Sequence, residues 1–213
     1  MPILTYLIIG FTCLTSLMAF QNQSLFIKYL FMPYQMRRSG EWYRFFTHAF
    51  IHANWPHLIF NMLSMYWLGE ITELTFYAMF GKFKGMLFFI LLYAGGIVLS
   101  SFPDFEKHKN NAYYSAVGAS GAICAVVFAF ILIYPVQGLM IFPFPFYIPA
   151  FAYGILFLTV SSYLAKRGGD NIGHSAHFWG AVFGFVFTLA LKFELGAGFV
   201  DQVRSYISEH LGM

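Results

Sequence analysis

A serine and a histidine stand at the starts of two long apolar stretches of this chain. Ser120 lies in the motif Gly118-Ala119-Ser120-Gly121, and His177 follows Ala176 at the start of the later stretch. Polar and ionisable residues at membrane depth cost free energy, so their presence there is a reason to expect function. A serine hydroxyl becomes a nucleophile when a nearby base takes its proton, and histidine suits that role at neutral pH. The pair therefore predicts hydrolytic chemistry within a bilayer.

Two more polar residues stand near the start of an earlier apolar stretch. His57 and Asn61 are four residues apart, so a helix places them on one face. Amide hydrolysis needs donors aimed at the developing oxyanion, and we expect these to be His57, Asn61 and the Ser120 backbone N–H. The first turns of the three stretches contain no Asp or Glu, and the nearest carboxylate, Asp170, precedes the last one. The residues therefore predict a dyad of Ser120 and His177 rather than a triad.

The composition indicates that a bilayer surrounds most of the chain. Hydrophobic residues make up 59% of the 213 positions and charged residues 10%, and the mean hydropathy is +0.66. A soluble domain is about one quarter charged. The net charge is only +3, and the basic residues are scattered along the sequence. This pattern favours neither a nucleic-acid partner nor a polybasic lipid switch. We therefore expect a multi-pass integral membrane protein with no nucleic-acid partner.

Six apolar stretches predict six transmembrane helices, since about 20 apolar residues cross a bilayer. We expect an all-α bundle in one domain over residues 1–193, followed by a short surface tail over residues 194–213. The predicted helices cover residues 3–20, 57–79, 84–101, 118–134, 148–165 and 174–193.

The connections between these stretches are polar or rich in glycine and proline. The longest, over residues 21–56, contains many aromatic residues and is expected to lie in the membrane interface. The sequence also predicts a polar loop over residues 103–111 and breaks over residues 142–145 and 166–170.

Consecutive spans cross the membrane in opposite directions, so the second, fourth and sixth begin at the same face. His57, Ser120 and His177 therefore belong to one leaflet. His177-x-x-Gly180-x-x-x-Gly184 forms a stripe with little side chain, and Gly121 begins a similar stripe beside the serine. Small residues let transmembrane helices approach closely, so we expect the fourth and sixth spans to touch.

Each of these residues also has a purely structural interpretation. The glycines beside Ser120 suit helix packing, Asn61 suits a hydrogen bond between helices, and His177 suits a hydrogen-bonded core position. His48 and His52 have the i, i+4 spacing of metal ligands, but no cysteine or carboxylate accompanies them. We therefore expect these two histidines to form hydrogen bonds within the interfacial loop, and we predict no metal site.

Taken together, the motifs resemble the rhomboid family of intramembrane serine proteases. They occur in order between about Arg44 and Phe193: His48-x-x-x-His52, His57-x-x-x-Asn61, Gly118-x-Ser120-Gly121 and Ala176-His177-x-x-Gly180-x-x-x-Gly184. The resemblance implies a six-helix rhomboid-like bundle with Ser120 as nucleophile and His177 as base. It also implies an oxyanion hole formed by His57, Asn61 and the Ser120 N–H, for which Gly118 leaves room. Family members cleave membrane-anchored proteins in or near a transmembrane segment and use no cofactor.

The sequence departs from the family pattern in two places. The family's Trp-Arg pair in the first loop appears as Trp42-Tyr43-Arg44, which leaves the packing of this loop open. Some members carry an aromatic residue one turn after the serine that packs on the catalytic histidine, whereas this chain has Cys124. Tyr153 or another aromatic residue is the expected substitute.

Two other functions compete with proteolysis. A rhomboid-like pseudoprotease would bind membrane segments without cleaving them, but Ser120 and His177 are both intact. A small-solute transporter would show inverted repeats and a polar site midway through the membrane, which this sequence lacks. We expect transmembrane protein substrates and a bacterial inner membrane as the location.

Overall fold

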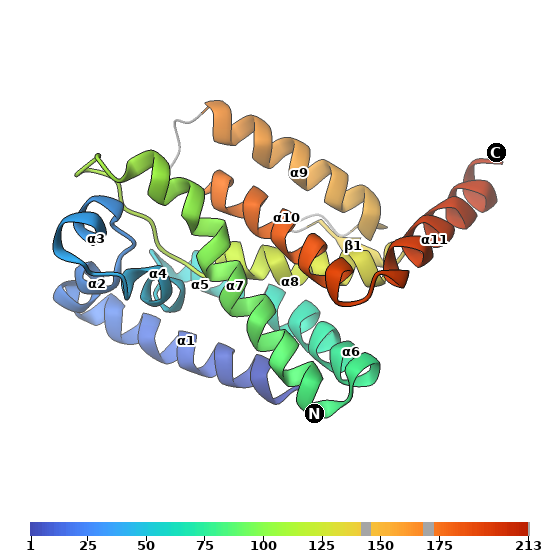
Figure 1. Ribbon diagram of the computed structural model, residues 1–213, viewed down its shortest axis with the longest axis horizontal. Helices are drawn as coiled ribbons and strands as arrows, with labels where there is room; N and C mark the ends of the chain where they lie inside the picture. The colour runs from blue at the N-terminus through green and yellow to red at the C-terminus, as the bar shows by residue number, and fades with distance from the viewer. Residues whose placement is uncertain (142–145, 168–172, 213) are drawn as a thin grey trace.

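The computed structural model describes residues 1–141, 146–167 and 173–212, most of which are helical (Figure 1). Each of the six predicted apolar stretches coincides with helix to within a few residues. The second stretch is divided into α5, η2 and α6, of which η2 is a π-helical segment. In chain order the elements are α1 (Ile3–Gln21), α2 (Gln23–Tyr29), α3 (Pro33–Ser39), α4 (Arg44–Thr47), η1 (His48–Phe50), α5 (Trp55–Ser64), η2 (Met65–Gly69), α6 (Glu70–Phe80), α7 (Lys82–His108), α8 (Ser120–Ile133), β1 (Gly138–Met140), β2 (Tyr147–Pro149), α9 (Ala150–Arg167), α10 (His174–Leu191) and α11 (Glu194–Leu211).

Three helices of the described chain are long and apolar enough to cross a membrane, judged by length and composition. They are α1, α7 and α10, whereas α8 is apolar but shorter, with 14 residues. The only strands in the described ranges, β1 and β2, form an antiparallel pair between α8 and α9. The protein is thus a mostly helical membrane protein.

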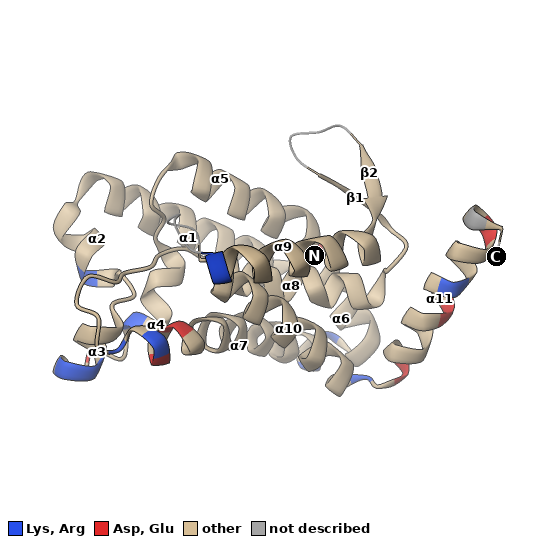
Figure 2. Ribbon diagram, turned by 90° about the horizontal axis from the view of Figure 1, so that it is seen from above, with Lys and Arg blue, Asp and Glu red and all other residues tan. Residues whose placement is uncertain are grey.

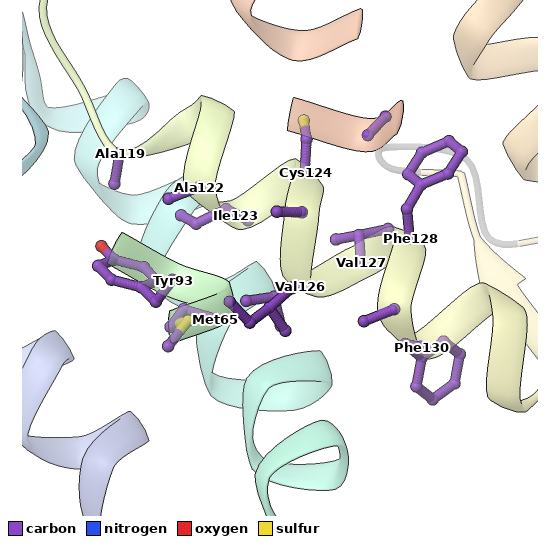
Figure 3. Packing of buried hydrophobic residues seen from close by; sticks show 14 of the residues in the cluster. Met65, Tyr93, Ala119, Ala122, Ile123, Cys124, Val126, Val127, Phe128 and Phe130 are labelled. Carbon is purple, nitrogen blue, oxygen red and sulfur yellow. The ribbon is translucent and has the colours of Figure 1, made fainter. Parts of the chain in front are cut away.

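Helix α8 is the core of the bundle. Every residue of α8 after Ser120 is buried, as expected for a helix that is apolar all round. Figure 3 shows Val126 pointing from α8 toward Met65 and Tyr93, while Cys124 points to the opposite side. Because α8 is enclosed by the other helices, its first residue is held in a fixed position at one end of the core.

Small residues allow the backbones of α8 and α10 to approach closely, as the sequence predicted. A methyl group on Gly180 would collide with the carbonyl of Gly121, and one on Gly184 would collide with the carbonyl of Ala125. On the other side of α8, a methyl group on Gly121 would collide with Ser100 of α7. The fourth and sixth predicted spans therefore touch.

The prediction of a polar loop over residues 103–111 is wrong for residues 103–108, which are helical. Helix α7 continues through Pro103 to His108, and the loop begins at Lys109. Tertiary packing outweighs the proline, since Phe105 is buried in a cluster with Phe31 and Met36. Pro103 cannot donate to the preceding turn, and membrane helices tolerate this loss where neighbouring groups compensate.

The stretch expected to lie in the interface forms α2, α3, α4 and η1. Arg44 is buried and holds these elements together, donating from Nη1 to the carbonyls of Ile27 at 2.9 Å and Leu30 at 2.8 Å. Trp42 packs on Phe105, with ring centroids 5.5 Å apart. The changed Trp-Tyr-Arg sequence is thus accommodated by packing. The predicted break over residues 142–145, and residues 168–170 of the other break, lie outside the described residues.

Substituting alanine for Gly184 tests the close approach of α8 and α10. We expect Gly184→Ala to lower the free energy of unfolding by about 2 kcal/mol, because the added methyl group forces the helices apart. Gly10→Ala is the matched control, since nothing lies within 4 Å of a methyl group at that position. Thermal unfolding of both variants in the same detergent checks this. Equal melting temperatures for the two variants would contradict the predicted contact.

Candidate active site

The first residue of α8 faces the first turn of α10. Nε2 of His177 lies 2.8 Å from Oγ of Ser120, within hydrogen-bond distance. Both residues are partly buried. A neutral imidazole placed in this way accepts the hydroxyl proton, which is the arrangement that activates a serine.

The backbone before Ser120 is held in an unusual conformation. Gly118 has φ of +114°, a value that L side chains rarely adopt. Its N–H donates to the carbonyl of His48 at 2.9 Å, which ties this turn to the interfacial segment. Ser120 occupies the first turn of α8, where backbone N–H groups have no partner within the helix. The Ser120 N–H is therefore available for an anion.

His57 lies against Gly118 and is positioned by the start of α5. Asn54 caps this helix, accepting from the His57 backbone N–H at 2.9 Å, and Pro56 fits the first turn. A methyl group on Gly118 would lie 2.5 Å from Cε1 and 2.7 Å from Nε2 of His57. Glycine therefore leaves the space that the His57 ring occupies beside the serine.

Asn61 is buried and hydrogen-bonded one turn further along α5. Its side-chain Nδ2 donates to Nε2 of His52 at 2.9 Å. Nε2 of His52 is therefore an acceptor, so the ring proton is on Nδ1, which donates to Oγ of Ser16 at 3.0 Å. Ser16 can then donate to the carbonyl of Phe50 at 3.2 Å. One N–H of Asn61 is used in this hydrogen-bond network, and the second has no partner among the described residues.

His48 connects the interfacial segment to α7. Its Nδ1 donates to the carbonyl of Arg44 at 2.8 Å, and its Nε2 lies 3.2 Å from Oγ of Ser101. Burial lowers the pKa of His48 to about 4 and the pKa of His52 to about 3, so both rings are neutral at pH 7. His48 bonds to Arg44 within the interfacial loop, as predicted, whereas His52 bonds to Ser16 of α1 and Asn61 of α5, outside that loop. Among the residues the structure describes, no group of three potential metal ligands occurs.

An aromatic residue from α9 packs near His177. The ring centroids of Phe157 and His177 are 6.2 Å apart, and the planes meet at 35°. Phe157 in turn packs on Tyr153 at 5.9 Å and on Phe128 of α8 at 5.7 Å. Phe157 is therefore the aromatic residue beside His177, where Tyr153 or another aromatic residue was expected, and Cys124 is buried in α8.

The structure brings the sequence-predicted site residues to one end of the bundle. Ser120 and His177 form a direct pair, and His57 and Gly118 are in contact. Asp170, the nearest carboxylate in the sequence, lies outside the described residues. Sequence reasoning missed the contact of the His48 carbonyl with Gly118, because no local pattern signals a backbone acceptor so distant in the chain.

Comparisons with known proteins agree with this arrangement. A family model described as Rhomboid domain matches residues 39–192. Rhomboid protease AarA of Providencia stuartii is 25% identical over 169 residues, which cover 74% of this chain and 58% of that protein. RHOMBOID-like protein 12, mitochondrial, of Arabidopsis thaliana is 25% identical over 167 residues, covering 75% and 49%. Rhomboid protease GluP of Bacillus subtilis is 24% identical over 168 residues, covering 79% and 30%. This chain thus spans less than two thirds of the length of each.

Adding a side chain at Gly118 tests whether this glycine shapes the site. We expect Gly118→Ala to abolish reaction of Ser120 with a fluorophosphonate, because the methyl group displaces His57 and the backbone at φ +114° is strained. Gly40→Ala is the control, since Gly40 has φ of +69° with nothing within 4 Å. Both variants carry backbone strain, and only Gly118→Ala disturbs the site. Wild-type labelling of Gly118→Ala would show that the space beside His57 is not required.

Proposed function

This chain belongs to the rhomboid family, and we propose that it is an intramembrane serine protease. Its substrates are membrane-anchored proteins, cleaved in or near a transmembrane segment. The observation that carries the proposal is the 2.8 Å separation of Ser120 Oγ and His177 Nε2 at the end of a buried apolar helix. The protease names of the relatives from Providencia stuartii and Bacillus subtilis support it.

The proposed reaction begins with Ser120. His177 Nε2 takes the hydroxyl proton while Oγ attacks the carbonyl carbon of the scissile peptide bond. The tetrahedral intermediate then collapses, the C–N bond breaks, and His177 returns the proton to the leaving amine. Water, deprotonated by the same histidine, hydrolyses the acyl-serine and regenerates both residues. The dyad is sufficient because packing against neighbouring helices limits the motion of the imidazole.

The oxyanion hole of the proposal is built from three donors. They are the backbone N–H of Ser120 at the start of α8, the free N–H of Asn61, and His57. The first is assisted by the positive end of the α8 dipole. The hydrogen bond from Asn61 to His52 supports the assignment, because it fixes the amide in one orientation. Gly118 contributes space rather than a donor.

The proposal includes the arrangement in the membrane. We propose six spans, with α5, η2 and α6 together forming the second and α8 the fourth. Residues 1–193 would form the membrane domain and residues 194–213 a surface tail, and Figure 1 shows α11 extending away from the other helices. The protein is an integral membrane protein, and we propose a bacterial inner membrane. A substrate helix must unwind to expose a peptide bond, so glycine or proline near the cleavage site would favour cleavage.

Phe157 is proposed as a positioning residue for His177. The Phe157 ring lies beside the imidazole, with ring centroids 6.2 Å apart, and packs on Phe128 and Tyr153. An aromatic ring in this place restricts rotation of the histidine without altering its hydrogen bond to Ser120. The role that the family gives to a residue of the fourth span would here be filled from α9.

Labelling with a fluorophosphonate probe tests the dyad. We expect wild-type protein to react at Ser120, and Ser120→Ala and His177→Ala to lower the reaction rate by roughly 10⁴-fold or more, because each removes an essential member of the pair. Ser64→Ala, which removes the hydroxyl of a partly buried serine that donates to the Phe60 carbonyl within α5, is the matched control and should react normally.

A second outcome would favour the competing function. A wild-type protein that unfolds cooperatively and yet fails to react would contradict the protease proposal. It would instead favour a pseudoprotease that binds membrane segments without cleavage.

Substitution of Phe157 tests its positioning role. We expect Phe157→Leu to lower kcat on a transmembrane substrate by about three- to tenfold, the effect of losing one aromatic contact. Phe157→Tyr should retain activity because the ring remains. Phe151→Leu, on the same helix but packed on Tyr206, controls for general destabilisation of α9. Equal kcat losses in Phe157→Leu and Phe151→Leu would contradict a role specific to His177.

A further inference from the structure

A cationic pocket lies where α3 meets the end of α7, outside the candidate active site. It is lined by Tyr34, Arg37 and Arg38 of α3 and by Lys109 and Asn110, which follow α7. The cavity volume is about 350 Å³. Figure 2 shows Lys and Arg at α3 and, beside acidic residues, at the adjoining end of the bundle, whereas most of the bundle carries no charge. We propose that this pocket binds the phosphate of an anionic phospholipid headgroup.

The two arginines of the pocket bond only to neutral groups in the described part of the chain. The guanidinium of Arg37 donates to Oδ1 of Asn110. Arg38 donates to the hydroxyl of Tyr34 at 2.9 Å, and its guanidinium carbon lies 5.2 Å from the centroid of that ring. Neither belongs to an ion pair among the described residues. Two adjacent positive charges thus line one cavity without a carboxylate partner.

The third cation does not neutralise the pocket. Lys109 pairs with Glu106 at 2.5 Å, and both side chains are partly exposed. Three cations therefore face one carboxylate. A planar guanidinium donates two parallel hydrogen bonds to phosphate, and a lysine adds a point charge, so the set suits a phosphate group. An anion in the cavity would satisfy the arginines without displacing a protein partner.

The surroundings place the pocket at the depth of lipid headgroups. Trp42 and Tyr43 are exposed at the same end of the molecule, with 52% and 41% of their surfaces accessible. Exposed tryptophan and tyrosine are typical of the membrane interface. Trp42 packs on Phe105 of α7, one turn before Lys109. Basic pockets at this depth bind lipid head groups, because the bilayer supplies phosphate at high local concentration.

The backbone segments that carry the pocket residues are packed against each other. Phe31, Met36 and Phe105 form a buried cluster between α3 and α7. Phe31 and Ala116 exchange two backbone hydrogen bonds, of 2.9 Å and 3.0 Å, so the loop after α7 is fixed against the segment before α3. The sequence concealed this cluster, since its basic residues appeared scattered until the fold joined them.

Lipid retention by the full chain tests the proposal. The protein is equilibrated in mixed micelles containing equal amounts of dioleoylphosphatidylglycerol and dioleoylphosphatidylcholine, and retained lipids are counted by native mass spectrometry. We expect wild type to retain phosphatidylglycerol preferentially. The double variant Arg37→Gln, Arg38→Gln should retain roughly tenfold less phosphatidylglycerol, because it loses the charge-assisted hydrogen bonds of both guanidinium groups. Arg204→Gln on α11, outside the pocket, should behave as wild type.

Separate arms distinguish the source of the phosphate and control for folding. An excess of inorganic phosphate should leave phosphatidylglycerol bound, and its displacement would overturn the lipid assignment in favour of a soluble anion. If thermal unfolding shows that the double variant does not fold, Lys109→Gln, from the other wall of the pocket, takes its place and should also lower the retention of phosphatidylglycerol. Equal retention of both lipids by wild type, or unchanged preference in the folded variants, would overturn the proposal. The readout is binding, so it is independent of proteolysis.

Discussion

The close approach of α8 and α10 is the constraint on which the rest of the structure depends. Lipid tails are as apolar as leucine, so apolar surface alone does not drive two helices together inside a membrane. Dispersion contacts must hold them, and these require that little side chain stands between the backbones. Gly180 and Gly184 lie against the carbonyls of Gly121 and Ala125, and this contact places the first turns of the two helices side by side. The 2.8 Å contact between Ser120 and His177 is a consequence of this packing.

A second requirement is that irregular backbone near the membrane be fully hydrogen-bonded. The turn before Ser120 and the segment after η1 are not regular helix, and lipid offers them no partner. The His48 carbonyl accepts from Gly118, while the imidazole of the same residue bonds to Arg44 and Ser101. The imidazole of His52 forms hydrogen bonds to the side chains of Ser16 and Asn61 and so links α1 to α5. The buried histidines are therefore structural supports of the site, and burial keeps the pKa of both well below neutral pH.

Sequence reasoning predicted what depends on local spacing. The helical stretches, the stripe ending at Gly184 and the pairing of Ser120 with His177 follow from periodicity and from the alternation of helix direction. Features that depend on tertiary packing could not be predicted in this way. The sequence suggested that helix α7 would end near Pro103, but burial of Phe105 carries it to His108. The sequence suggested Tyr153 or another aromatic residue as the neighbour of His177, and only the rotation of α9 decides that Phe157 packs on the ring.

The length of α8 explains why these supports are needed. With 14 residues, α8 is about 21 Å long at 1.5 Å per residue, whereas the hydrocarbon core of a bilayer is about 30 Å thick. In the proposed six-span arrangement a helix this short does not reach both interfaces, so the chain at its ends would enter the membrane as loop. Such backbone is tolerated only where it is buried in protein or lines a water-filled cavity. Gly118 and Ala119 are buried, so the loop meets the first condition, and partial exposure begins at Ser120.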